Sequence, residues 1–117
     1  MDLENIRTYC LNKPAVNESF PFDKNTLVFK VGSKMFALMS LDRVPLNINL
    51  KCEPEKAVQL RNDYPQITPG YHMNKKHWNT IRIDGILSPD LIKALIDHSY
   101  ELVVNGLTKK ERLKFNI

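Results

Sequence analysis

Cysteines and long apolar runs are both scarce in this chain of 117 residues. The longest unbroken apolar run covers residues 35–39, far short of the roughly 20 residues that span a bilayer. The first ten residues are acidic from the second position and contain no apolar signal-peptide core. These absences argue against the transmembrane and secreted classes, and they predict a cytoplasmic protein that does not bind membranes.

Only Cys10 and Cys52 carry thiols, which is too few for a disulfide framework, so both are predicted to be reduced and unpaired. Together with His72 and His77 they would complete a four-ligand set. However, the paired ligand spacing of zinc modules is absent, and no Asp or Glu lies between Gln66 and Asp84. The sequence therefore predicts neither a metal nor another cofactor.

Motifs of known catalytic chemistry are also missing. The chain has no spaced carboxylate pair, no activated-serine motif, no phosphate loop and no HExxH. His72 or His77 could serve as a general base, but isolated histidines are more often structural. We therefore predict a protein that is not an enzyme and has no catalytic residues.

The length and the order of the expected elements predict a single domain over residues 1–117. Helices are expected over 2–11, 54–64 and 89–105, the last capped by Ser88, and a short basic helix over 108–115. Strands are expected over 26–31, 34–41, 45–52 and 78–84, with a shorter one over 71–73. Residues 12–25 read as a loop that Phe20 and Phe22 anchor to the core. The resulting fold class is α+β, an antiparallel sheet with helices packed on one face.

One strand alternates strictly between apolar and polar residues. Leu46, Ile48 and Leu50 point one way, so that Asn47, Asn49 and Lys51 point the other. If the apolar side meets the helices, the opposite face of the sheet carries the following set: Lys30, Asn47, Asn49, Lys51, Trp78, Thr80 and Arg82. This set is basic, rich in amides, free of acid, and contains one large aromatic residue.

Such a face suits nucleic acid, because Lys and Arg neutralise phosphates, Asn bonds to base edges and Trp stacks. Two alternatives remain open: the face is solvated and has no partner, and the tryptophan belongs to the core. Residues 67–81 add two adjacent lysines, Lys75 and Lys76, and both His72 and His77. The basic excess of the chain lies in its middle and at its C-terminal tail.

Four stretches carry a family resemblance: "ESFPF" at 18–22, "TLVFKVGSKMFALM" at 26–39, "PLNINLKCEPEKAVQLR" at 45–61 and "PGYHMNKKHWNTI" at 69–81. Together they resemble the YjbR/MmcQ family of small bacterial proteins. The resemblance implies a compact fold similar to bacterial frataxin (CyaY-like), described in this family as a double wing, and it implies DNA binding. Frataxins hold iron on an acidic ridge, whereas Asp2 and Glu4 are the only acids of the first helix here, so iron handling does not carry over.

The sequence and the resemblance together predict a monomeric, non-enzymatic DNA-binding protein that uses the polar sheet face and an adjoining wing. The predicted contact residues are Lys30, Asn47, Asn49, Lys51, His72, Lys75, Lys76, His77, Trp78 and Arg82. A protein-interaction module that uses the same face is the alternative. An enzyme or small-ligand binder that uses His72 or His77 is the least favoured interpretation.

Overall fold

The computed structural model describes residues 1–70 and 73–117 and contains one six-stranded sheet. The helices are α1 (Leu3–Leu11), α2 (Pro54–Asp63), α3 (Pro89–Asn105) and α4 (Lys109–Phe115). The strands are β1 (Val16–Ser19), β2 (Thr26–Val31), β3 (Lys34–Ser40), β4 (Leu46–Lys51), β5 (Ile67–Pro69) and β6 (Trp78–Ile83). None of the helices among the described residues has the length and hydropathy needed to cross a bilayer.

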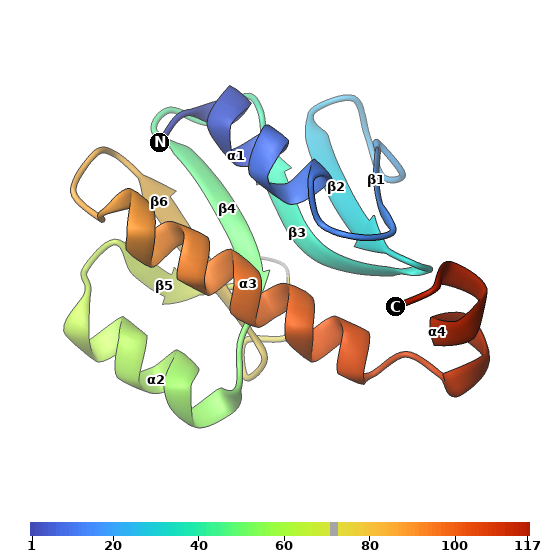
Figure 1. Ribbon diagram of the computed structural model, residues 1–117. Helices are drawn as coiled ribbons and strands as arrows, with labels where there is room; N and C mark the ends of the chain where they lie inside the picture. The colour runs from blue at the N-terminus through green and yellow to red at the C-terminus, as the bar shows by residue number, and fades with distance from the viewer. Residues whose placement is uncertain (71–72) are drawn as a thin grey trace.

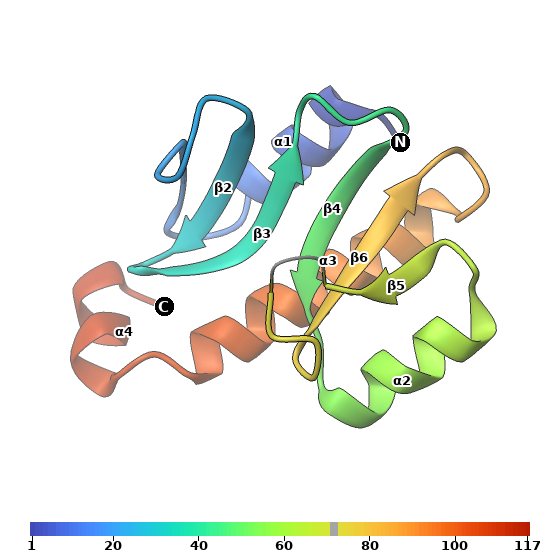
Figure 2. The same cartoon turned by 180° about the vertical axis from the view of Figure 1, so that it is seen from behind.

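The strands are ordered β1-β2-β3-β4-β6-β5, and every neighbouring pair is antiparallel. Helix α3 runs diagonally across one face of the sheet, with α1 beside it (Figure 1). Seen from behind, the strands lie in front and no helix crosses them (Figure 2). The prediction of an α+β fold with helices on one face is therefore confirmed.

The helix boundaries follow the capping residues that the sequence shows. The side chains of Asp2, Ser88 and Thr108 accept hydrogen bonds from the backbone N–H three residues on, at 2.8, 3.1 and 3.1 Å. Pro54 and Pro89 each begin a helix, where a missing N–H costs nothing. Three of the four expected helices thus begin with a satisfied side-chain cap.

The core lies between the sheet and the helices, and the alternation in β4 sets its orientation. Ile48 and Leu50 are buried in the main cluster with Ile81 of β6 and Ile92 and Ile96 of α3. Leu27, Phe29 and Val31 of β2 are also buried there, as predicted from their spacing. Asn47, Asn49 and Lys51 consequently lie on the face that the helices leave uncovered.

Ser99 of α3 joins the helix layer to the sheet by hydrogen bonds. Its hydroxyl is fully buried, donates to the carbonyl of Phe36 at 2.6 Å and accepts from the backbone N–H of Lys51 at 2.9 Å. These two backbone groups lie at the end of the β3–β4 pair, beyond the last paired residues Ala37 and Leu50. Ser99 thus satisfies two groups that would otherwise be buried without partners.

Two local predictions were wrong, and a third falls largely on residues that the structure does not describe. Residues 16–19, expected in a loop, form the edge strand β1, in which Val16 pairs with Val31. Phe20 and Phe22 do not anchor a loop, since they are 49% and 63% exposed. The strand that pairs with the outer side of β6 is Ile67–Pro69; the one expected over 71–73 includes Tyr71 and His72, which lie outside the described residues.

Candidate functional site

The uncovered face of the sheet, which we call the open face, is built mainly from β4 and β6. The register pairs Asn49 with Thr80, Asn47 with Arg82 and Lys51 with Trp78. The Thr80 hydroxyl donates to the Asn49 side-chain oxygen, which ties the two strands together in the middle of the face. Lys30 of β2 has the same orientation, because its neighbours Phe29 and Val31 both point into the main core.

A groove of about 1070 Å³ runs over this face. Its floor is formed by residues of β3, β4 and β6, one wall by segments 22–26 and 43–45, and the other by segments 65–69 and 73–74. Most of its polar lining consists of amides and hydroxyls: Ser40, Asn47, Asn49, Gln66, Thr68, Asn74 and Thr80. The groove is therefore largely uncharged at its centre, and its lining combines these polar groups with apolar side chains: Phe22, Met35, Leu38, Val44, Pro45, Pro65, Pro69 and Met73.

Trp78 does not lie on the surface of the open face. It is 9% exposed and forms a second, small cluster with Val28 and Leu38, against which Met35 and Met73 pack. The ring is covered, so its predicted role as a stacking platform is wrong. Trp78 instead belongs to an apolar cluster on the side of the sheet that faces away from the helices.

Gly70 and segment 73–77 lie close to this cluster. The backbone N–H of Gly70 donates to the carbonyl of Trp78 at 2.9 Å, and a Cβ at Gly70 would lie 2.8 Å from the Trp78 Cβ. Just before β6, the N–H groups of His77 and Trp78 donate to the carbonyl of Asn74 at 3.2 and 2.9 Å. Glycine at position 70 thus permits the close approach that buries the tryptophan.

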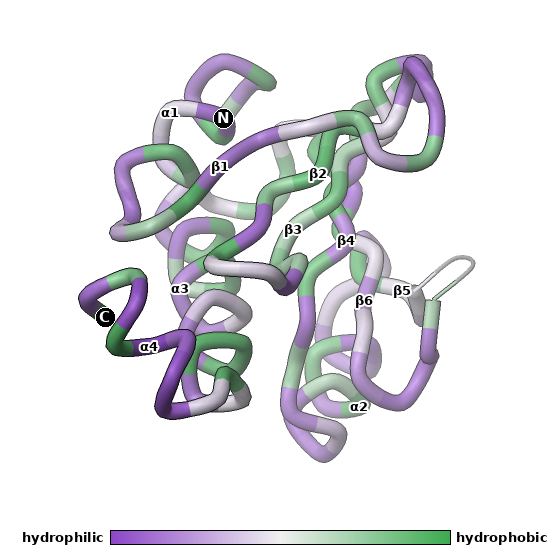
Figure 3. The backbone as a smooth tube through the Cα atoms, turned by 90° about the vertical axis from the view of Figure 1, so that its right-hand side faces the viewer, coloured by the Kyte–Doolittle hydropathy of each residue, from purple (hydrophilic) through white to green (hydrophobic). Residues whose placement is uncertain are grey.

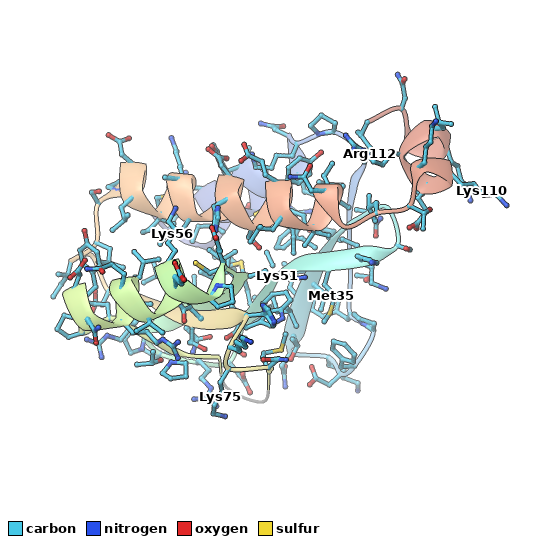
Figure 4. The ribbon with its side chains drawn as sticks, turned by 90° about the horizontal axis from the view of Figure 1, so that it is seen from below. Met35, Lys51, Lys56, Lys75, Lys110 and Arg112 are labelled. Atoms are coloured by element: carbon cyan, nitrogen blue, oxygen red, sulfur yellow. The ribbon has the colours of Figure 1, made fainter. Side chains whose placement is uncertain are left out.

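Lys75 and Lys76 are exposed on the resulting segment, 74–77. In Figure 4, Lys75 projects from the side of the sheet opposite α3, whereas Lys51 lies at the level of the sheet. The hydropathy colouring shows the same segment as hydrophilic, on the side away from α3 (Figure 3). Neither lysine has a carboxylate partner within residues 1–70 and 73–117. Their ammonium groups are therefore placed to meet an anion near the groove.

The open face is not free of acid, so this part of the sequence interpretation is corrected. Arg82 Nε donates to Asp84 Oδ2 at 2.8 Å, and that hydrogen bond lowers the pKa of the Asp84 carboxyl. Asp23 lines the groove and accepts from the backbone N–H groups of Asn25 and Thr26 at 2.8 and 2.7 Å, which also lowers its pKa. Both carboxyls are ionised at neutral pH, so Arg82 supplies less free positive charge than predicted.

The histidine and cysteine predictions have different outcomes. His72 lies outside the described residues, and His77 is half-buried, with its carbonyl accepting from the N–H of Cys52 at 2.7 Å. Cys10 and Cys52 are buried free thiols, as predicted. No three His, Cys, Asp or Glu side chains of the described residues lie close enough together to hold a metal ion. The absence of a bound metal stays a prediction.

The structure brings together only part of the predicted residue set. Asn47, Asn49 and Arg82 line the groove, whereas Lys30, Lys51, Lys75, Lys76, His77 and Trp78 lie outside its lining. Sequence reasoning missed Phe22, Arg43, Gln66 and Thr68, which also line it. Their signal was weak, because all four lie in segments for which no helix or strand was predicted, and they reach the groove only through the tertiary fold.

The fold and the open face define a class: an α+β domain in which helices cover one face of an antiparallel sheet and leave a groove of mixed polar and apolar lining on the other. The family model described as YjbR matches residues 11–102. The chain belongs to the YjbR family, which confirms the resemblance noted in its sequence.

Relatives match over nearly the full length of the chain. It is 43% identical over 110 residues to the Escherichia coli O157:H7 protein named "Uncharacterized protein YbdF", covering 93% of this chain and 89% of that one. It is 33% identical over 112 residues to "Uncharacterized protein YjbR" of Escherichia coli strain K12, covering 96% and 95%.

Solved structures give the same result for the fold. A crystal structure of Deinococcus radiodurans protein DR2400, with a DUF419 domain, superposes with a TM-score of 0.92 at 43% identity and covers 98% of this chain and 88% of that one. A crystal structure of a Pseudomonas syringae protein has a TM-score of 0.75 at 30% identity, covering 87% and 98%.

Proposed function

We propose that this protein is a cytoplasmic, non-enzymatic nucleic-acid-binding protein, with DNA as its ligand, and that the open face is the binding surface. The observation that carries the proposal is that hydrogen-bonding side chains and lysines occupy different parts of this face. Amides and hydroxyls line the groove together with apolar side chains, and the lysine-bearing segment 74–77 adjoins its wall at Asn74. Lysines position a phosphate backbone without reading it, whereas amides form hydrogen bonds to base edges.

The charge of the chain supports an anionic partner. The formal net charge is +4, and Lys30, Lys51, Lys75 and Lys76 add positive charge to the open face or beside it. On the helix side, Arg7 and Lys13 are held in ion pairs with Glu18 and Asp97, both at 2.5 Å, although Lys109 and Lys110 of α4 are exposed there with no carboxylate partner among the described residues. Arg7 and Lys13 stabilise the fold, while the lysines of the open face remain for a ligand.

The test is a salt titration of DNA binding, followed by fluorescence anisotropy with a labelled mixed-sequence oligonucleotide. If the four lysines of the open face each meet a phosphate, log K should fall with log salt at a slope of about −3 to −4, since each contact contributes about 0.7 on single strands and 0.9 on duplex. A folded protein that binds no oligonucleotide at low salt would exclude this function. The open face would then be assigned to a protein partner.

A further inference from the structure

We infer that the groove of the open face accommodates one unpaired nucleic-acid strand, and that Phe22 is the surface on which a base stacks. The inference rests on the proposed function and specifies its ligand. It starts from a residue that the sequence interpretation placed in the core. Phe22 is 63% exposed and forms part of the groove wall, so its ring is accessible from the groove.

The shape of the groove argues against a duplex as the occupant. Base edges of a duplex are read by an element that enters the major groove, about 12 Å wide. Here the amides of Asn47 and Asn49 lie on a central strand that lines a hollow, and not on a projecting element that could enter the major groove. An unpaired strand presents its bases outward and can place them in a hollow.

The wall that contains Phe22 suits a base better than a phosphate. Asp23 adjoins the ring, and its carboxylate stays ionised because two backbone N–H groups donate to it and lower its pKa. Arg43 lines the same wall, so this wall carries charges of both signs and attracts phosphates less than the lysine side does. The opposite wall leads through Asn74 to Lys75 and Lys76, where phosphates find positive charge. A strand would therefore lie with its backbone along the lysines and its bases toward Phe22.

Single-strand binding surfaces combine these two components, a positively charged track and exposed aromatic rings, and stacking tolerates any base. The amides and hydroxyls of the floor then add hydrogen bonds to base edges. The positive charge of Lys75 and Lys76 also favours a nucleic-acid strand over an uncharged peptide, because an uncharged peptide would gain no electrostatic attraction from these lysines. The groove, the ring and the lysines thus select the same class of ligand.

The experiment compares Phe22→Ala with Phe20→Ala, using a short labelled single strand and the same sequence closed into a hairpin duplex. Both phenylalanines are exposed, so neither substitution should unfold the protein, but Phe20 does not line the groove. We expect the unchanged protein to prefer the single strand. Phe22→Ala should weaken single-strand binding by about 5- to 150-fold, the range for one lost base stack, and Phe20→Ala should leave it unchanged.

Three outcomes would overturn the inference. If the strand and the hairpin bound equally and Phe22→Ala had no effect, the protein would still bind nucleic acid. An unpaired strand would then not be its preferred ligand, and Phe22 would not be the stacking residue. Competition by an acidic peptide of matched charge at equal concentration would assign the groove to a protein partner instead. If the protein bound neither oligonucleotide, both the proposed function and the inference would be contradicted.

Discussion

Trp78→Ala is expected to lower the free energy of unfolding by about 3–5 kcal/mol, the usual cost of truncating a buried tryptophan. The ring is 9% exposed and is the largest member of the small cluster with Val28 and Leu38. Its removal would leave a cavity between the sheet and the segment that begins at Met73. Urea or guanidinium unfolding followed by circular dichroism measures the change.

Trp78→Phe is the matched control, because it keeps an aromatic ring at the same position. It should cost clearly less than the alanine substitution. If Trp78→Ala instead changed stability by under about 0.5 kcal/mol, the range of an ordinary surface substitution, the tryptophan would be a surface residue. It would then again be a candidate for stacking on a base.

Replacing Lys75 and Lys76 together by Ala is expected to weaken single-strand binding by about 25-fold at about 0.1 M salt, and to flatten the salt slope by about 1.4. These values follow from the loss of two phosphate contacts at about 0.7 each. All sequences should be weakened alike, since lysines contact phosphates and not base edges. Because both side chains are exposed and neither has a carboxylate partner among the described residues, the fold should be unaffected.

The matched control removes Lys109 and Lys110, two adjacent exposed lysines of α4. Figure 4 places Lys110 on the helix side of the molecule, away from Lys75. This pair changes the net charge by the same amount, so it measures the contribution of long-range attraction alone. Equal weakening by both double substitutions would mean that overall charge, and not segment 74–77, determines binding.

The elements with strong periodic signals could be predicted from the sequence. Apolar and polar side chains alternate strictly over residues 46–51, so a shift of one residue would expose three apolar side chains. The alternation therefore predicted which face of the sheet the helices leave uncovered. Helix α3 begins at Pro89 after the cap Ser88 and ends at Asn105 before Gly106, as the residues at its ends indicate. In both cases the local pattern and the tertiary packing agree.

The candidate site could be predicted only in part, because its walls come from segments distant in the sequence. Phe22 and Thr68 belong to segments with no periodic signal, and they become neighbours of β4 only after the sheet has formed. The alternation in β6 correctly places Trp78 on the same face as Thr80, but it does not show that Val28, Leu38 and Met73 cover the ring. Asp84, in contrast, follows the same alternation as Arg82 in the strand expected over 78–84, so this pair could have been predicted from the sequence.

The most direct test of the open face as the binding surface is a nuclear magnetic resonance titration of the isotope-labelled protein with a short single strand. We predict shifts of the side-chain amides of Asn47 and Asn49 and of the backbone amides of residues 74–77, with α1 and the outer surface of α3 unchanged. Shifts confined to the helix side, with the resonances of Asn47, Asn49 and Lys75 unmoved at saturation, would contradict the account.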